Sequence, residues 1–361
     1  MKTYNDFYPQ LCSYKNLYRA FKKARKGKTL KQYVIDFEAN LKENLLQLRV
    51  DLLFHSYNPQ PLKTFIIRDP KIRKISKAEF RDRIVHHALV NILEPIYENI
   101  FIHDSFANRI GKGTLNAIKR FDNFKTKVSK NNTKQCFVLK ADIRHYFNTI
   151  DHDILSSIIS RKIKDKNVIF LIKKILANYS SESKEKGMPL GNLTSQFLAN
   201  VYLNELDQFV KHQLKATYYI RYVDDFVILS RNKALLETYR QKISFFLLSN
   251  LHIQLHPTKS KISPLSCGID FLGFRIFYHH KLLRKSNLRR FKKKPVILKE
   301  KLDNQQLAYD TVYDTMLGSI AYARQANTYT IRKRLLSQFD KLFSNQISTI
   351  EINRARKQKL L

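Results

Sequence analysis

The sequence predicts an α+β fold in which helices cover one side of a sheet. Helical and strand-like stretches are mixed along the chain, without the regular strand–helix–strand repeat of a doubly wound parallel sheet. Hydrophobic residues make up 43% and aromatic residues 12% of the 361 residues, which are ordinary values for a chain that buries a core. This length allows two or three compact units, and the composition excludes global disorder.

The N-terminal part is expected to form helices and then a hairpin. Residues 14–60 carry apolar side chains at helical spacing, among them Phe37 and Leu41, beside many Lys and Arg side chains, which indicates basic amphipathic helices. From residue 61 to residue 76 the pattern becomes extended around a turn-forming Asp-Pro pair. This pattern predicts a hairpin with a basic tip, and residues 80–100 then predict one long helix.

The middle of the chain mixes strands with helices. The glycine turn Arg109–Thr114 is expected to start a helix. Further expected elements are strands at residues 136–142, 218–229 and 268–278 and helices at residues 154–179 and 195–213. The segment at 218–229 is interrupted by an acidic turn, so we expect two strands there. Residues 281–361 form a strongly basic segment with a helical pattern.

The charge of the chain favours a polyanionic partner. There are 66 Lys and Arg residues against 30 Asp and Glu residues, which gives a formal net charge of +36 at pH 7. Such a charge repels itself in the compact state and is favoured where a polyanion supplies the opposite charge. We therefore expect nucleic acid as a partner, with an anionic membrane surface as the alternative.

Cysteine usage and hydropathy indicate the compartment. Cys12, Cys136 and Cys267 lie far apart in the sequence, so neither a disulfide framework nor a cysteine zinc site is indicated. The sequence begins without an apolar signal segment and contains no run of about 18 apolar residues. We expect a reduced protein of the cytoplasm that neither is secreted nor spans a membrane.

The candidate catalytic residues are acidic. Most carboxylates in so basic a chain, such as Glu38 and Asp165, are expected to be surface partners of Lys and Arg. Asp142 and the adjacent Asp224 and Asp225 differ, because they end or interrupt apolar strands. A divalent cation would relieve their repulsion, since Mg²⁺ in proteins is held by one or two carboxylates while phosphates and water complete its coordination. A solvated turn is the alternative for the Asp pair.

Several motifs occur together in a fixed order. They are the basic hairpin Arg68–Arg73, the strand ending at Asp142, the loop Gly187–Asn192, the acidic hairpin Tyr222–Asp225, the pair Lys259 and Lys261, and the segment Phe271–Phe274. This order and spacing, with its Tyr-x-Asp-Asp signature, resembles a reverse transcriptase, an RNA-directed DNA polymerase. The resemblance extends from about Pro61 to Phe277.

The resemblance implies a right-hand polymerase fold and two-metal chemistry. Residues 1–60 would form an N-terminal basic helical extension and part of the fingers, residues 61–280 the fingers and the palm with its antiparallel sheet, and residues 281–361 a helical thumb. Two Mg²⁺ ions, or Mn²⁺ ions, would be held about 4 Å apart for nucleotidyl transfer. The implied catalytic and metal-binding residues are Asp142, Asp224, Asp225 and the backbone carbonyl of Ile143. Neighbouring side chains on extended backbone point apart, so the contact of Asp225 is expected to be weaker or indirect.

The resemblance also implies residues that bind the incoming dNTP and the primer. Arg73 and Arg68 would grip the triphosphate, for which guanidinium groups are suited. Phe147 would exclude a 2′-hydroxyl, and Lys259 would protonate pyrophosphate. The remaining residues implied at the dNTP are Leu190, Gly191 and Gln196, and those of the primer grip are Phe271, Leu272, Gly273 and Phe274. The alternatives are general phosphate binding for Arg68, a basic surface for Lys259, and core packing for the phenylalanines.

Two residues differ from the pattern common in reverse transcriptases and point to one group within that family. Leu190 stands where Gln is usual and Gln196 where Pro is usual, a variant that resembles the reverse transcriptases of diversity-generating retroelements. That resemblance implies cDNA synthesis with errors at template adenines (mutagenic retrohoming). It also implies a prokaryotic or phage-encoded cytoplasmic protein. The implied partners are the template RNA, the RNA/DNA duplex and dNTPs, together with a small basic oligomeric accessory protein. An apolar side chain in place of an amide removes hydrogen bonds near the nascent base pair.

Other functions remain open at this point. One alternative is a group II intron-like or defence-associated reverse transcriptase, and another is a non-catalytic RNA-binding protein on the same fold. Retention of Asp142, Asp224, Asp225 and Phe147 argues against the last. The sequence ends near Leu361, so we expect no RNase H, protease or integrase unit.

Overall fold

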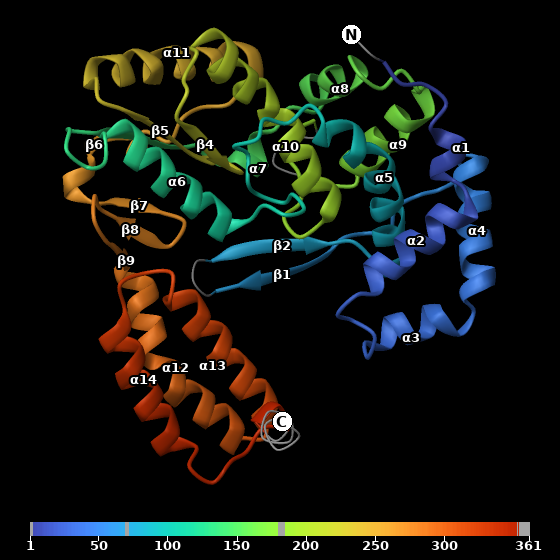
Figure 1. Ribbon diagram of the computed structural model, residues 1–361. Coiled ribbons are helices and arrows are strands. Elements are labelled where there is room, and N and C mark those ends of the chain that lie inside the picture. Colours follow the sequence, from blue (N-terminus) through green and yellow to red (C-terminus); the bar gives the residue numbers. More distant parts are fainter. Residues whose placement is uncertain (1–2, 69–71, 180–184, 352, 354–361) are drawn as a thin grey trace. The chain divides into compact units, whose positions relative to one another are not determined.

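The computed structural model describes residues 3–68, 72–179, 185–351 and 353 (Figure 1). The fold is α+β, as the sequence predicts, and the described strands form sheets of two, four and three strands. The residues divide into two compact units: one holds residues 1–117 and 139–262, and the other holds residues 118–138 and 263–361. The expected three-domain division stays a prediction, and these two units cut the chain differently because residues 118–138 belong with the C-terminal part.

The chain begins with helices. They are α1 (Tyr8–Leu11), α2 (Tyr14–Arg25), α3 (Gln32–Ala39), α4 (Leu41–Leu53) and, after the first hairpin, α5 (Phe80–Glu98). The Ser13 hydroxyl caps α2 by accepting a hydrogen bond from the Asn16 N–H at 3.2 Å. The buried Asn16 amide in turn donates to the Ala88 carbonyl of α5 at 3.1 Å, which ties the two helices together. The helices expected from the apolar spacing are confirmed.

The first hairpin consists of β1 (Lys63–Ile67) and β2 (Arg73–Lys77). The two strands pair antiparallel, with Ile67 opposite Arg73. Every residue of β1 is exposed, so this strand contributes no core. The expected hairpin is confirmed, whereas its basic tip at residues 69–71 lies outside the described residues.

The four-stranded sheet has the order β4-β5-β3-β6. Its strands are β3 (Phe137–Asp142), β4 (Tyr219–Tyr222), β5 (Asp225–Ser230) and β6 (Lys261–Pro264). β4 and β5 are antiparallel, with Tyr222 opposite Asp225. The apolar residues from Phe226 to Leu229 are buried, as expected for a continuous hydrophobic run inside a sheet. The strand, acidic turn and strand predicted at residues 218–229 are therefore confirmed.

Six further helices and one π-helical turn accompany these strands. They are α6 (Thr114–Val128), α7 (Tyr146–Thr149), α8 (His152–Ser160), α9 (Lys166–Ala177), α10 (Leu193–Gln208), the π-helix Phe209–Gln213 and α11 (Lys233–Leu251). The single helix expected at residues 154–179 is wrong. Asp165 interrupts it by accepting hydrogen bonds from the N–H groups of Asn167 and Val168 at 3.0 and 3.2 Å, which starts α9. Asp165 is 6% exposed and also accepts from the Tyr8 N–H, so it is a buried cap and not a surface partner of Lys or Arg.

The C-terminal unit has its own small sheet and helices. Its elements are a 3₁₀ turn (Leu265–Cys267), the strands β7 (Ile269–Phe271), β8 (Phe274–Ile276) and β9 (Lys281–Leu283), and the helices α12 (Lys285–Asp303), α13 (Tyr309–Ala323) and α14 (Tyr329–Leu342). The single strand expected at residues 268–278 is wrong. Leu272 and Gly273 have φ angles of 46° and 91°, which fold the segment into a hairpin. The helical segment expected from residue 281 is confirmed in α12, α13 and α14, whereas Lys281–Leu283 forms the strand β9.

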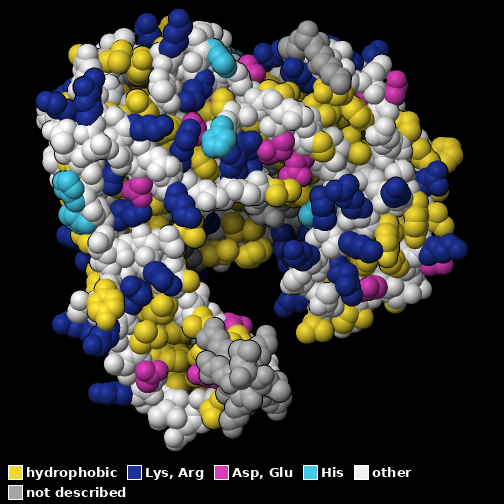
Figure 2. Space-filling view, in the orientation of Figure 1, with side chains coloured by type: hydrophobic (Ala, Val, Ile, Leu, Met, Phe, Trp, Pro, Cys, Tyr) yellow, Lys and Arg dark blue, Asp and Glu magenta, His cyan; other side chains and the backbone are white. Residues whose placement is uncertain are grey.

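The surface reflects the composition. On the face shown in Figure 2, Lys and Arg side chains are clearly more numerous than Asp and Glu side chains. Among the described residues, no helix is both long enough and apolar enough to cross a membrane.

Candidate active site

Asp142 and Asp224 come together at the ends of neighbouring strands. Asp142 is the last residue of β3, and Asp224 lies in the two-residue turn that joins β4 to β5, the strand beside β3. Burial, and after it the negative charges of Asp142 and Asp225, raise the pKa of Asp224 to about 6, and the positive charge of Lys259 opposes them. The pair is thus costly to ionise in the free protein. Two carboxylates that repel each other fit a divalent cation.

Lys259 is the cation closest to this pair. Its ammonium lies 3.2 and 3.3 Å from the two carboxylate oxygens of Asp142. Lys259 is exposed, so the ion pair is weak. Lys259 thus lies beside Asp142, and its role toward pyrophosphate stays a prediction.

Asp225 is placed differently from the other two carboxylates. Its Oδ1 lies 4.0 Å from the ammonium of Lys140 on β3. Within the described ranges, no group of three or more His, Cys, Asp and Glu side chains is arranged to hold one metal ion. The charges of Asp142 and Asp225 both act on Asp224, and Asp225 in addition faces Lys140 on β3.

The backbone after Asp142 is held by a neighbouring segment. The Asp142 carbonyl accepts a hydrogen bond from the His256 N–H at 2.7 Å, and the Arg144 N–H donates to the Gln254 carbonyl at 2.9 Å. Ile143 lies between these two bonds, opposite Leu255. Its backbone is therefore fixed, and metal binding by its carbonyl oxygen stays a prediction.

Phe147 and the loop that contains Leu190 are joined by a backbone hydrogen bond. Phe147 is half-buried in α7, and its carbonyl accepts a hydrogen bond from the Met188 N–H at 2.7 Å. The Leu190 carbonyl accepts from the Ser76 N–H at 2.9 Å, which attaches the loop to β2. Phe147, the Leu190 loop and β2 are thus connected through backbone hydrogen bonds, and the steric-gate role of Phe147 and the contact of the loop with a base pair stay predictions.

Gly191 and Asn192 close the contact between this loop and β2. Gly191 has a φ angle of 115°, and a Cβ atom there would stand 2.7 Å from the Ile75 Cγ2 atom, so only glycine fits. The buried Asn192 side chain accepts from the Ala78 N–H at 2.9 Å and donates to the Ser76 carbonyl at 3.1 Å. Sequence reasoning missed this role, because an Asn before a helix predicts an N-cap, whereas the Asn192 side chain makes no capping bond to α10.

The remaining dNTP residues lie on elements around this loop. Arg73 is the first residue of β2 and is exposed, and Arg68 directly follows β1 and is also exposed. Gln196 is half-buried in the first turn of α10. Arg73 and the Leu190 loop are therefore linked through one strand, whereas contact of either arginine with a triphosphate stays a prediction.

The segment expected to grip the primer belongs to the C-terminal unit. Phe271 and Phe274 are 1% and 0% exposed, and their rings pack against Phe121 and Tyr322 at centroid distances of 5.7 and 4.9 Å. Both phenylalanines are therefore core residues, which was the alternative interpretation. Leu272 and Gly273 form the turn between them, and primer contact by this turn stays a prediction.

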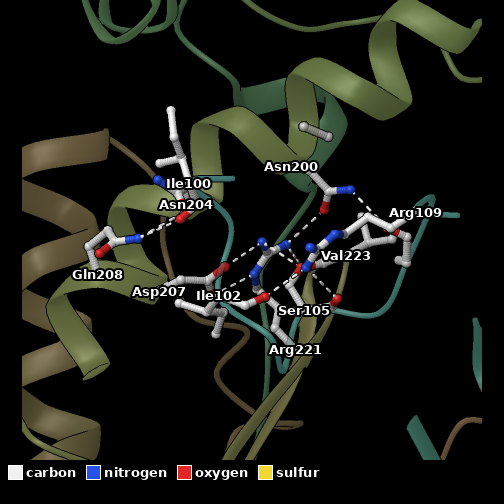
Figure 3. A network of polar contacts seen from close by, with 12 residues as sticks. Ile100, Ile102, Ser105, Arg109, Asn200, Asn204, Asp207, Gln208, Arg221 and Val223 are labelled. Carbon is white, nitrogen blue, oxygen red and sulfur yellow. Dashed lines mark hydrogen bonds and ion pairs between the residues drawn. The ribbon is translucent and has the colours of Figure 1, made fainter. Parts of the chain in front are cut away.

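A buried arginine supports the Asp224 turn and was missed from the sequence. Figure 3 shows Arg221 of β4 surrounded by the side chains of Asp207, Asn200 and Ser105 and by the Val223 carbonyl. Arg221 and Asp207 are both 0% exposed, and their charged groups approach to 2.6 Å. In a chain with 66 Lys and Arg residues, one more arginine carries no sequence signal of burial.

Comparison with known proteins identifies the family of the chain. The family model for reverse transcriptase (RNA-dependent DNA polymerase) matches residues 67–276. Protein YkfC of Escherichia coli is 28% identical over 287 residues, which cover 69% of this chain and 73% of that protein. The group II intron-encoded protein LtrA of Lactococcus lactis is 25% identical over 335 residues, covering 73% of this chain and 54% of LtrA.

Among solved structures, telomerase from Candida albicans has a TM-score of 0.49 at 11% identity and covers 81% of this chain and 57% of that chain. The chain spans about half the length of LtrA and a smaller share of some other relatives. The family model covers more than half of the chain, including every acidic residue of the candidate site. The chain therefore belongs to the reverse transcriptase family of RNA-dependent DNA polymerases.

Proposed function

We propose that this chain copies a template RNA into cDNA at a centre formed by Asp142 and Asp224, and that it does so with low fidelity, as in a diversity-generating retroelement. The single observation that carries the catalytic part is the placement of Asp142 and Asp224 at the ends of neighbouring strands, where burial and the neighbouring carboxylates raise the pKa of Asp224 to about 6. A carboxyl group kept in such surroundings fits a site where a divalent cation binds. Family membership implies RNA-directed polymerisation of dNTPs and use of a divalent metal.

The residues of the site have different roles in nucleotidyl transfer. Asp142, Asp224 and the Ile143 carbonyl would hold the metal ions, with Asp225 as a weaker or indirect contact. The bound ions would activate the primer 3′-hydroxyl and neutralise charge that develops on the pyrophosphate. Phe147 excludes the 2′-hydroxyl of a ribonucleotide. Lys259, 3.2 Å from Asp142, is near enough to the centre to give a proton to the leaving group.

Triphosphate binding would involve the first hairpin. Arg73 and Arg68 are exposed at its two strands, where guanidinium groups can form bidentate bonds with phosphate oxygens. Gly191, bare of a side chain, lets β2 approach the loop closely. The arginines of the hairpin would bind the triphosphate, and Leu190 of the loop would face the base. The hairpin and the loop are joined through β2.

Low fidelity is proposed from Leu190 and Gln196. The Leu190 backbone is fixed by its bond to Ser76, so its side chain has a defined place and cannot offer the hydrogen bonds of an amide. Weaker polar contact with the nascent pair reduces discrimination between correct and incorrect bases. A small basic oligomeric accessory protein that binds the template RNA is part of this proposal.

A second candidate function is that of an intron-type reverse transcriptase. It is favoured by the 25% identity to the group II intron-encoded protein LtrA and by 37% identity over 138 residues to an uncharacterised protein in a cob intron of Schizosaccharomyces pombe. Such an enzyme would share the carboxylate centre but would not need errors at adenines.

One experiment tests both parts of the proposal. Primer extension on a defined RNA, followed by sequencing of every cDNA, should show synthesis that is lost in Asp142→Ala and Asp224→Ala although both variants still bind RNA. Errors concentrated opposite template adenines support the diversity-generating type. Low and evenly distributed errors favour the intron type, and normal synthesis by either alanine variant overturns the assigned centre.

A further inference from the structure

The turn that carries Asp224 has an unfavourable backbone conformation. Val223, directly before Asp224, has a φ angle of 55°, in the left-handed region. This region is disfavoured for residues other than glycine and most of all for β-branched ones. Such a conformation persists only where surrounding contacts enforce it. The direction of the Asp224 carboxylate depends on this turn, because the two residues form it together.

Arg221 supplies the enforcing contact. Its Nη1 group donates to the Val223 carbonyl oxygen at 3.1 Å. The two residues are separated only by Tyr222, so the bond closes a small ring of backbone and side chain around the start of the turn. A change of the Val223 conformation would move this carbonyl and break the bond.

The guanidinium itself is held from several sides (Figure 3). Its Nε donates to Asp207 Oδ1 at 2.7 Å, and Nη2 donates to Asp207 Oδ2 at 2.6 Å and to Ser105 Oγ at 3.1 Å. The second N–H of Nη1 donates to Asn200 Oδ1 at 3.1 Å. With the bond to Val223, all five N–H groups of Arg221 have acceptors.

These contacts come from elements that do not belong to the turn. Asp207 and Asn200 lie on α10, and Ser105 lies in the segment that pairs with β4 through the Ser105–Arg221 bridge. Asn200 is fixed in turn, because its amide donates to the Ala107 carbonyl at 2.8 Å. The position of the Val223 carbonyl is therefore set by α10 and by the segment before α6.

We propose that Arg221 is a positioning residue: it locks the left-handed Val223 and so aims Asp224 at Asp142. This inference rests on the metal-binding role proposed above for Asp224. A lysine cannot replace the arginine, since an ammonium has three donors and no planar fork, whereas four separate groups accept bonds here. The buried Arg221–Asp207 pair is not explained by stability, because buried ion pairs contribute little net stability compared with apolar residues of similar size.

The test compares Arg221→Lys with Tyr219→Phe in the full chain. Tyr219 is the matched control, because its hydroxyl donates to the same Asp207 Oδ1 at 2.7 Å but does not contact the turn. Primer extension gives kcat and KM for the dNTP, electron paramagnetic resonance gives the affinity of the metal-free protein for Mn²⁺, and thermal unfolding gives stability.

For Arg221→Lys we expect kcat to fall by about 100-fold, as for a reacting group misplaced by about 1 Å, with KM little changed. Mn²⁺ binding should weaken several-fold at temperatures where the variant is folded. Adding Val223→Gly should restore part of kcat, because glycine adopts the left-handed conformation without the arginine. Tyr219→Phe should keep normal kcat and Mn²⁺ affinity.

Normal kcat and Mn²⁺ affinity in folded Arg221→Lys overturn the inference. An equal loss of kcat and Mn²⁺ affinity in Tyr219→Phe also overturns it, because Tyr219 does not contact the turn. Should Arg221→Lys not fold, Asn200→Ala decides the matter, because it removes one of the two bonds that hold Nη1 in place against the Val223 carbonyl while the Asp207 pair remains. Unchanged kcat and Mn²⁺ affinity in Asn200→Ala then overturn it, and reduced values support it. Asp224→Asn distinguishes failure of the metal-binding role of Asp224 from failure of the positioning role of Arg221. If Asp224→Asn keeps synthesis and Mn²⁺ binding, the metal-binding role is wrong. If Asp224→Asn loses both while Arg221→Lys is normal, only the positioning role is wrong.

Discussion

At the scale of single residues, the ionisation of Asp224 links the site to pH. The pKa of its carboxyl group is about 6 in the metal-free fold and 3.8 in the reference state, mainly because of burial. Between these values the folded protein binds more protons than the unfolded chain, so the free energy of unfolding falls as pH rises from about 4 to about 6. Above pH 6 Asp224 is ionised, so the folded protein carries the full free-energy cost of this buried charge. A bound cation would remove that cost.

We therefore predict that Asp224→Asn stabilises the metal-free protein. At pH 7.5 in EDTA the free energy of unfolding should rise by on the order of 2 kcal/mol, and the gain should shrink as pH is lowered toward 4. Urea denaturation at a series of pH values measures this. Asp36→Asn, which changes an exposed carboxylate, is the control and should show little effect. A gain that does not depend on pH would contradict the role of ionisation.

Leu190 governs a second prediction at this scale. Leu190→Gln should lower the error frequency opposite template adenines by about fivefold, the value of one added hydrogen bond. The fixed backbone confines the change to the side chain. Sequencing of cDNA made by the variant and by the parent measures the error frequency. Gln196→Pro restores the other common family residue and shows whether the two departures act separately, and an unchanged error spectrum in Leu190→Gln would rule out this loop as the cause.

At the scale of elements, the contact of β2 with the Leu190 loop joins two parts of the proposed dNTP site. Asn192→Ala removes both side-chain bonds that Asn192 makes to β2, at 2.9 and 3.1 Å. Buried backbone groups left without partners cost about 1–3 kcal/mol each, so the melting temperature should fall. KM for the dNTP should also rise, since Arg73 lies on the loosened strand.

Steady-state primer extension and thermal unfolding together measure these two effects. Asn99→Ala is the matched control, because the exposed Asn99 amide donates only a local bond to the Pro95 carbonyl at 3.0 Å. It should lower neither stability nor dNTP affinity appreciably. A destabilised Asn192→Ala with unchanged KM would separate the loop contact from triphosphate binding.

The elements also show what sequence reasoning can reach. Strand ends marked by a carboxylate after an apolar run, at Asp142 and around Asp224, were predictable because burial and charge change abruptly there. The break at Asp165 and the hairpin turn at Leu272 and Gly273 were not, since each depends on a few local bonds inside a continuous apolar pattern. Arg221 and Asn192 were missed because their partners are distant in sequence.

At the scale of the whole molecule, the net charge of +36 predicts strong salt dependence of RNA binding. With six to ten phosphate contacts, affinity should fall by roughly 10³- to 10⁵-fold between 50 and 200 mM salt. Lys292 and Lys293 of α12 are exposed, and changing both to Gln should reduce the slope of log affinity against log salt by about 2. Fluorescence anisotropy with a labelled RNA measures the slope.

The control for this prediction is Lys299→Gln in the same helix. The Lys299 ammonium is paired with Asp303 at 2.8 Å, so its charge is balanced locally. Its loss should leave the slope nearly unchanged. Equal reductions in the double variant and in the control would mean that α12 acts through overall charge and not through direct phosphate contacts.

The turn at Gly273 restricts which amino acids can replace this glycine during evolution. A Cβ atom at residue 273 would stand 2.7 Å from the Asn287 amide nitrogen and still closer to the Tyr322 hydroxyl. The Asn287 amide donates to the Gly273 carbonyl at 3.2 Å and to the Tyr322 hydroxyl at 3.2 Å. One added methyl group would therefore disturb α12 and α13 at once. Any other amino acid at this position would have to adopt the left-handed φ angle of 91° and displace both side chains, whereas exposed lysines of α12 such as Lys292 can be exchanged one at a time.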